Sequence, residues 1–290
     1  MKKYVIPAFV AAAVVTAAPA LAADIAPVYK APPAPVAINP WNIAVGGSVM
    51  TDYNFRGISQ SDRGPSVGAY FEGQYKASDA VTFYAAIAGV SVDLPTNPTA
   101  EIDYYGGVRI TTGKLSWDLG VWYYHYPKEG IVGLPPVDTD FLEFYGKLNW
   151  AVTDQFALGG GVYYADDWLN TGASGTYLSG TAKYVFPASG PWGAFVSGEL
   201  AHYWLGTTTP VLGSIDLPDY TYWNAGIGLT YKALTVDLRY HDTNLSEEQC
   251  GTVTGNAGAG FTVTGAPMSK WCGQAYIAKL SFDTTLNDLK

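Results

Sequence analysis

The sequence predicts an all-β protein, a transmembrane antiparallel up-and-down β-barrel of about 12 strands. Three observations support this fold class: segments in which apolar and polar residues alternate, connectors that are alternately long and short, and a composition poor in charge. Charged residues make up 14% of the 290-residue chain, and aromatic residues also 14%. Soluble domains average about 25% charged residues. Low charge and many aromatic side chains suit a barrel in which every second side chain faces lipid.

Residues 1–22 have the features of a secretory signal peptide. A basic start (Lys2, Lys3) precedes an apolar stretch and a small-residue cleavage site at residues 20–22. A membrane anchor is the alternative, but the apolar stretch is short and is interrupted by a proline. Residues 23–40 are rich in proline and are expected to form an extended periplasmic linker, with a plug inside the barrel as the alternative.

From residue 41 onward, side chains alternate between apolar and polar, which is the period of two that a strand imposes. The sequence therefore predicts an outer-membrane barrel over residues 41–282, followed by a C-terminal tail at 283–290. The predicted strands are approximately 41–56, 66–77, 81–92, 100–111, 115–126, 140–152, 156–166, 175–187, 191–205, 220–232, 234–244 and 271–282.

The connectors between these segments are alternately long and short, beginning with a long one. The long connectors are 56–66, 93–100, 127–139, 166–174, 206–219 and 245–270. Outer-membrane barrels have short periplasmic turns and long external loops. The pattern therefore predicts a protein of the Gram-negative outer membrane with both termini in the periplasm. A soluble sandwich has no reason to alternate in this way.

Charged side chains occupy one face of most segments, whereas aliphatic and aromatic side chains occupy the other. A Lys or Arg facing lipid at mid-depth costs about 2–4 kcal/mol, so the charged face is expected to line the lumen. The segment 81–92 is apolar on both faces, and the pattern does not orient it. The predicted pore-lining residues are Asp52, Arg56, Glu72, Glu101, Asp103, Arg109, Asp118, Glu143, Lys147, Lys183, Glu199, Asp237, Arg239 and Lys279.

The outward aromatic residues are expected to form two girdles at the membrane interfaces, whereas the core of a sandwich would scatter them along the strands. The periplasmic girdle would comprise Trp41, Tyr75, Trp117, Trp150, Phe156, Phe186, Trp192, Tyr231 and Phe282. The external girdle would comprise Tyr53, Phe55, Tyr123, Tyr164, Trp204 and Trp223.

The two cysteines, Cys250 and Cys272, bracket the longest connector. In an oxidising compartment such a pair indicates a disulfide. A metal site is the alternative, but no histidine or further cysteine lies nearby in the sequence. Acidic residues recur in the connectors and could hold Ca²⁺, but the chain has no DxDxDG loop, so a solvated acidic rim is favoured. No metal and no cofactor are predicted.

The three histidines give little support for an enzyme. The alternation directs His125 and His202 outward and only His241 inward, whereas a nucleophile and its base must share one side. No GxSxG elbow is present, and no GxGxxG motif lies between a strand and a helix. We therefore expect no catalytic residues.

The formal net charge of −9 argues against a nucleic-acid partner, because phosphate contacts need clustered Lys and Arg. The expected partners are outer-membrane lipid and small solutes or ions. The sequence leaves open whether the protein forms a homo-oligomer.

Several phrases are similar to those of a known family. DYNFRGISQSD (52–62), AEIDYYGG (100–107) and GVWYYHYP (120–127) resemble phrases of the TorF family of porin-like outer-membrane proteins, the Gcw_chp type. FLEFYGKL (141–148) is similar to a later strand of the family that carries a Glu between aromatic residues. The second half of the chain matches only in pattern. The resemblance implies an outer-membrane barrel with a porin function, without an established substrate or catalytic residues.

Together these observations predict a porin-like channel for passive diffusion of small solutes or ions. The alternative is a closed structural or adhesive barrel whose external loops bind a partner. A lipid-modifying outer-membrane enzyme comes third, because the histidine arrangement disfavours it.

Overall fold

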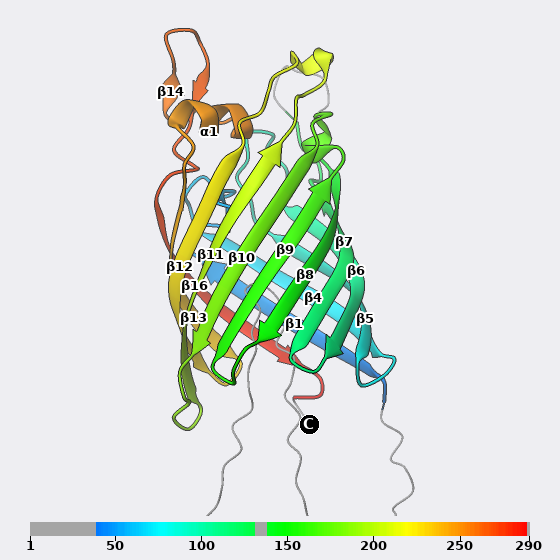
Figure 1. Cartoon of the computed structure of the whole chain (residues 1–290). Coiled ribbons are helices and arrows are strands. Elements are labelled where there is room, and N and C mark those ends of the chain that lie inside the picture. Colours follow the sequence, from blue (N-terminus) through cyan, green and yellow to red (C-terminus); the bar gives the residue numbers. More distant parts are fainter. Residues whose placement is uncertain (1–38, 131–137, 289–290) are drawn as a thin grey trace, which may run out of the picture.

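The computed structural model describes residues 39–130 and 138–288, so the predicted signal peptide and most of the predicted linker lie outside the described residues. Twelve antiparallel strands form a closed barrel, which confirms the predicted fold class (Figure 1). The barrel strands are β1 (Trp41–Met50), β4 (Ser66–Lys76), β5 (Val81–Val90), β6 (Glu101–Thr112), β7 (Leu115–His125), β8 (Phe141–Ala151), β9 (Phe156–Ala165), β10 (Gly175–Val185), β11 (Trp192–Leu205), β12 (Tyr220–Tyr231), β13 (Leu234–Thr243) and β16 (Ala275–Thr285).

The barrel closes because β1 pairs with strands on both sides. Its residue Trp41 is opposite Tyr75 of β4, and Gly47 is opposite Phe282 of β16. Every other strand pairs with its neighbours in sequence. The ladder therefore has no free edge, which is what a wall in contact with lipid requires.

Two predicted strands differ from the observed ones by more than two residues at an end. The first ends at Met50 instead of residue 56, because residues 51–65 turn into the barrel. The last runs over Ala275–Thr285 instead of 271–282, because its end continues to pair with β1 as far as Thr285 opposite Ala44. The predicted tail therefore begins inside the last strand.

The short connectors gather at one end of the barrel, here called the turn end, and the long ones at the other, the loop end (Figure 1). The described chain begins and ends at the turn end, where the amide of Leu286 donates to the carbonyl of Ile43. The loop end carries the minor elements: β2 (Asn54–Phe55), β3 (Ile58–Ser59), η1 (Trp168–Asn170), η2 (Pro210–Leu212), α1 (Glu247–Thr254), β14 (Gly260–Phe261) and β15 (Pro267–Met268).

The exterior of the barrel is apolar, and the interior holds the polar side chains. In β5, which the sequence did not orient, Phe83 and Ile87 are exposed on the exterior, whereas Tyr84 is buried inside. Trp41 is 61% exposed and Trp192 57% exposed at the turn end, as expected for an aromatic girdle. Such an exterior would be unstable in water and suits lipid. Among the described helices, none is both long and apolar enough to cross a membrane.

The external girdle contains two errors. Tyr53 and Phe55 do not lie on the exterior, because the chain has already left β1 and entered the barrel. The hydroxyl of Tyr53 donates to Glu101 on the interior side of β6, and the ring of Phe55 packs edge-on against Tyr124. Tyr123, Tyr164 and Trp204 do lie exposed on the exterior.

Candidate functional site: a plugged barrel lumen

Residues 51–65, hereafter the plug, fold into the loop end of the lumen as a small hairpin. β2 and β3 pair Asn54 with Ser59 and Phe55 with Ile58, which leaves a two-residue turn at Arg56 and Gly57. Both turn residues have positive φ, 49° and 90°, as a tight hairpin turn of the primed type requires. A Cβ on Gly57 would come within 2.4 Å of a methyl carbon of Thr243, so the tip of the plug needs a glycine.

The base of the plug is held by its own side chains. The Asp52 carboxylate accepts hydrogen bonds from the hydroxyls of Ser59 (2.6 Å) and Ser61 (3.1 Å) and lies 3.6 Å from the Arg63 guanidinium. Burial raises the pKa of Asp52 above its ordinary value, although the two serine hydrogen bonds and Arg63 oppose that rise. The stretch DYNFRGISQSD is therefore a compact folded unit, which explains why its aspartate and serines occur together.

At the tip of the plug, Arg56 forms a bidentate ion pair with Glu143 of β8. Arg56 Nη1 lies 2.7 Å from Glu143 Oε1, and Nη2 lies 2.8 Å from Oε2. Nη1 also donates to the hydroxyl of Tyr203 at 3.0 Å. Arg56 is 8% exposed and Glu143 is fully buried. This two-pronged geometry is the strong form of the Arg–carboxylate interaction.

Three tyrosine rings surround the same guanidinium. The Arg56 Cζ atom lies 4.7 Å from the ring centroid of Tyr163, 4.4 Å from that of Tyr177 and 5.0 Å from that of Tyr203. These residues and Glu143 come from the four consecutive strands β8 to β11. Period-two geometry places them all on the interior face, so the wall itself builds an aromatic cage with a carboxylate. We call Glu143, Tyr163, Tyr177 and Tyr203 the cage.

The plug has a second contact with the wall at Glu101. The hydroxyls of Tyr53 (2.6 Å) and Tyr126 (2.8 Å) donate to its two carboxylate oxygens. Asp103, two residues further along the interior face of β6, is also buried, and its Oδ1 atom has no hydrogen-bond partner in the structure. The two tyrosine hydroxyls thus supply hydrogen bonds to both carboxylate oxygens of Glu101, in place of a basic residue.

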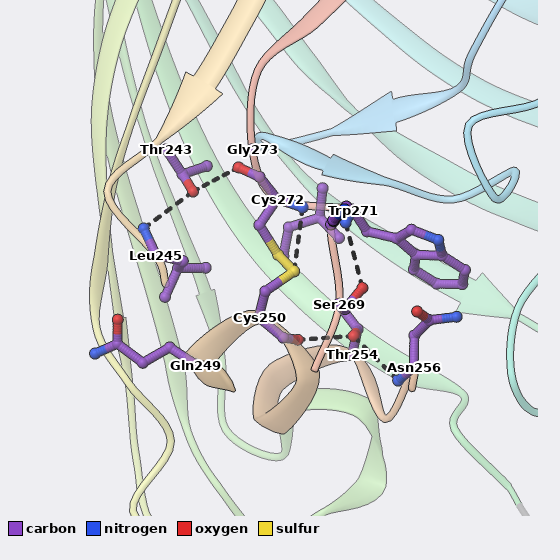
Figure 2. The surroundings of a disulfide bond; sticks show 12 residues. Thr243, Leu245, Gln249, Cys250, Thr254, Asn256, Ser269, Trp271, Cys272 and Gly273 are labelled. Carbon is purple, nitrogen blue, oxygen red and sulfur yellow. Dashed lines mark hydrogen bonds between the residues drawn. A yellow bond between two sulfur atoms is a disulfide. The ribbon is translucent and has the colours of Figure 1, made fainter. Parts of the chain in front are cut away.

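A disulfide-bonded loop covers the plug from outside. Cys250 of α1 is bonded to Cys272, which confirms the predicted disulfide (Figure 2). The segment around Cys272 contacts the plug directly, because the Trp271 carbonyl accepts from the Ser59 amide at 3.0 Å. The Trp271 indole also donates to Asp62 at 2.7 Å. The Arg63 guanidinium donates to the carbonyls of Lys270 and Gly273 at 2.6 and 2.8 Å.

The plug completes a hydrophobic cluster that fills the loop end of the lumen. It contains Ile58 of the plug, Val253 and both cysteines of the loop, and inward aromatic residues of the wall such as Tyr124, Phe141 and Tyr220. The Tyr220 hydroxyl donates to the carbonyl of Arg56 at 3.1 Å. Protein therefore closes the loop end of the lumen in this structure.

The turn-end half of the lumen is lined by ion pairs. Arg109 makes a bidentate pair with Glu72 (2.6 and 2.8 Å), and its Nε lies 3.5 Å from Asp118. Lys147 lies 3.5 Å from the same Asp118. On strands later in the chain, Arg239 of β13 pairs with Asp237 at 2.9 Å and donates to Ser197 of β11 at 2.8 Å. Arg109, Asp118, Lys147, Arg239 and Asp237 are partly exposed, whereas Glu72 is as buried as Glu143.

The structure places the predicted lining residues in three groups. Asp52 and Arg56 belong to the plug. Glu101, Asp103, Glu143 and Glu199 lie on the wall around it, where Glu199 accepts from Tyr177 at 2.8 Å. The third group projects into the turn-end half and comprises Glu72, Arg109, Asp118, Lys147, Lys183, Asp237, Arg239 and Lys279, with Lys183 Nζ 3.8 Å from the ring centroid of Phe195. Their role in lining a pore stays a prediction.

The cage was missed by the sequence analysis. A signal did exist: Tyr163, Tyr177 and Tyr203 fall on the predicted interior face, although a water-filled lumen has little use for so many aromatic rings. An interior face rich in tyrosine therefore indicates a filled lumen.

At the loop-end rim, Glu129, Asp138 and Asp140 lie close together, with ligand oxygens within 4.8 Å of one another. Hydrogen bonds already engage two of them: Asp140 accepts from the Tyr126 amide at 2.7 Å and Glu129 from the Thr139 hydroxyl at 2.7 Å. Burial alone would raise the pKa of Asp140. The hydrogen bonds with Tyr126, His125 and Tyr123 lower it by more, so the pKa lies below its ordinary value. This arrangement is explained without a metal.

The fold and the polar interior define the class of protein: a β-barrel of the outer-membrane type, with its first loop folded into one end of the lumen. The chain belongs to the Gcw_chp family, described as bacterial proteins of unknown function, whose model matches residues 34–266. The resemblance of the sequence motifs to the Gcw_chp type is thereby confirmed. No curated protein matches the sequence.

Solved structures of an outer-membrane channel, a porin and a third protein match this chain at low sequence identity. The COG4313 outer membrane channel from Pseudomonas putida F1 is 11% identical, with 91% of this chain and all of that chain covered and a TM-score of 0.49. The NanC porin is 12% identical, with 83% and 98% covered and a TM-score of 0.47. A protein from a study of in-meso crystallization of membrane proteins is 10% identical, with 85% and 84% covered and a TM-score of 0.50. At such identities the likeness concerns the fold alone.

Proposed function

We propose that this protein is a channel of the outer membrane for passive passage of small solutes or ions, and that the plug holds it closed. The observation that carries this proposal is that a connector between two strands occupies the loop end of the lumen. A connector, residues 51–65, fills the centre of the loop end and packs against inward aromatic residues of the wall. Withdrawal of the plug would leave the pairing of the twelve strands intact.

The width of the barrel supports the same function. Eight strands enclose a space that side chains fill, whereas 16 to 18 strands leave an aqueous channel. A barrel of twelve strands lies between these limits, so its lumen is wide enough to hold a folded segment such as the plug. The short turns and both ends of the described chain would then face the periplasm, and the disulfide-bonded loop would face outward.

We propose no catalytic activity. A triad needs a histidine held between a carboxylate and a nucleophile. His125 contacts Asp140, His202 contacts Thr221, and His241 contacts the hydroxyl of Tyr222. No histidine in the described part of the chain bridges the two kinds of group.

The second candidate is a closed barrel whose external loops bind a partner. Exposed apolar residues at two loop tips favour it: Val211 is 94% exposed, Phe261 is 67% exposed and Val263 is fully exposed. Such side chains carry no structural role in the barrel, and exposed apolar groups often mark contact sites.

Single-channel recording separates the two candidates. We would compare the wild type with a variant in which residues 53–62 are replaced by a short Gly/Ser linker. The channel proposal expects rare openings in the wild type and a sustained conductance in the variant. A matched control shortens the hairpin tip at residues 261–265, which lies outside the lumen, and should behave like the wild type.

Both variants must run as folded barrels, shown by a mobility that differs between unboiled and boiled samples. If the folded plug variant carries no current, the channel proposal is wrong and the closed-barrel candidate stands.

A further inference from the structure

The cage belongs to the wall of the barrel and would persist when the plug leaves. Glu143, Tyr163, Tyr177 and Tyr203 lie in β8 to β11, and each strand is paired on both sides. Glu143 is also held from the wall, because the Tyr124 hydroxyl donates to its Oε2 atom at 3.0 Å. Only Arg56 comes from the plug. The cage is therefore a preformed site, and Arg56 is its occupant.

Withdrawal of Arg56 would leave without a cation the Glu143 carboxylate, which is fully buried while the plug is in place. The wall groups in contact with Glu143 are the neutral hydroxyls of Tyr124 and Tyr203. A buried carboxylate that loses its only cationic partner is strongly destabilised. A soluble cation that fits the cage would remove this penalty, whereas an anion would increase it.

The geometry selects among cations. Both Glu143 oxygens receive a separate N–H, at 2.7 and 2.8 Å, and three rings face the planar group at 4.4 to 5.0 Å. A guanidinium presents two parallel donors and a flat face that stacks on aromatic rings. An alkylammonium is a point charge and can match only the cation–π part of the site.

We propose that the cage is a binding site for a guanidinium-bearing solute, and that Arg56 occupies it as a tethered competitor. A guanidinium solute that displaces Arg56 would favour the withdrawn plug, since a ligand shifts an equilibrium toward the state that it binds better. This opening step rests on the proposed channel function, whereas the binding site itself does not.

The test uses the full-length protein in detergent and methylguanidine as the probe, with binding measured by calorimetry. Arg56→Ala empties the cage, and we expect it to bind methylguanidine at least about ten times more tightly than the wild type, in which Arg56 competes. The matched control is Arg56→Ala/Glu143→Gln, which keeps the rings but removes the charge and should lose this binding. Methylammonium should bind the emptied cage more weakly than methylguanidine, and acetate should not bind.

If Arg56→Ala does not fold alone, refolding with methylguanidine gives the same information. The yield of folded barrel should rise with methylguanidine and should rise less with methylammonium. The proposal is overturned if Arg56→Ala/Glu143→Gln binds methylguanidine as tightly as Arg56→Ala does, or if methylguanidine raises its folded yield to the same extent. It is also overturned if methylguanidine neither binds to nor raises the folded yield of either variant.

A conductance measurement on the same proteins distinguishes this inference from the channel proposal. Binding without conductance would uphold the cage and contradict the channel. Conductance of Arg56→Ala without any methylguanidine binding would contradict the cage and uphold the channel.

Discussion

The two halves of the lumen use the same wall but hold their charges differently. At the loop end, Arg56 and Glu143 are almost fully buried among tyrosine rings. At the turn end, the side chains of Arg239 and Asp237 are 16% and 18% exposed, and those of Arg109 and Asp118 are similar, although Glu72, the partner of Arg109, is as buried as Glu143. Inward tyrosines occur in both halves, since the Tyr84 ring lies 3.7 Å from Arg109 Cζ, so the difference arises from the inserted segment. The nearly complete burial of the arginine at the loop end is therefore a local effect of the plug.

The two kinds of ion pair also differ in the free energy that is lost when one partner is removed. A buried ion pair that loses one partner costs about 3–5 kcal/mol, because the remaining charge has no solvent. A partly exposed pair costs far less, since water replaces the lost partner. Substitution of Glu143 should therefore affect the plug strongly, and substitution in the partly exposed Arg239–Asp237 pair should have a small effect.

The largest effect is expected for Glu143→Gln. The substitution leaves the Arg56 guanidinium buried without a counter-ion and should lower the free energy of local unfolding of the plug by about 3–5 kcal/mol. Hydrogen exchange at the amides of Ser59 and Gln60 measures this quantity, because both amides are hydrogen-bonded in the closed plug.

Asp237→Asn is the matched control at the turn end. It breaks the ion pair with Arg239 and should change the exchange of the plug amides by less than about 1 kcal/mol. Equal effects of the two substitutions would contradict the distinction between the buried pair at the loop end and the partly exposed Arg239–Asp237 pair.

Cys250→Ser tests the cover over the plug. The disulfide closes a loop with a sequence separation of 22 residues, which by loop entropy stabilises the loop by about 3 kcal/mol. Its loss should free the segment that holds Ser59, Asp62 and Arg63, so exchange of the plug amides should rise. The barrel should still assemble, because neither cysteine lies in a barrel strand.

Heat-dependent mobility in gels checks the assembly of the Cys250→Ser barrel. Plug amides that exchange as slowly as in the wild type would show that the disulfide stabilises only its own loop.

Gly57→Ala should destabilise the plug more than a comparable glycine substitution at the turn end. A methyl group at Gly57 meets both an unfavourable φ and a contact with Thr243 at 2.4 Å, which together cost about 2–4 kcal/mol. Gly113 has a φ of 60° but nothing within 4 Å, so Gly113→Ala should cost only about 1 kcal/mol. Denaturant unfolding and plug exchange would be measured for both variants. Equal costs would mean that the tip of the plug is loosely packed.

The strands and the disulfide could be predicted from the sequence because both leave a periodic or pairwise signal. Lipid on one side and polar groups on the other force alternation along each strand. The plug could not be predicted, because residues 51–56 continue this alternation while the backbone has already turned. The change of direction depends on contacts with Tyr203, Tyr220 and Trp271, which are distant in sequence. Alternation reports which face a side chain takes, but not whether the lumen behind it is filled.

The smallest expected effect concerns ion selectivity at the loop-end rim, measured in the variant that lacks residues 53–62. Asp166 and Asp167 are exposed there, and each accepts one hydrogen bond, from the hydroxyl of Tyr164 and the amide of Gly172. Their charge should favour cations, but only within a Debye length of about 8–10 Å at ordinary salt. Asp140 is a poorer test residue, because it also holds the Tyr126 amide in place.

In a planar bilayer with a salt gradient, the reversal potential of this variant should indicate a weak preference for cations. The preference should fade between about 0.1 M and 1 M salt, where the screening length falls to about 3 Å. Asp166→Asn/Asp167→Asn should reduce it at low salt and leave the conductance at high salt unchanged. In contrast, the predicted lining residues of the turn end comprise three acids and five bases, so that half should not by itself favour cations. A reversal potential that Asp166→Asn/Asp167→Asn leaves unchanged would place the selectivity in that half instead, and an anion preference would contradict the role of the rim altogether.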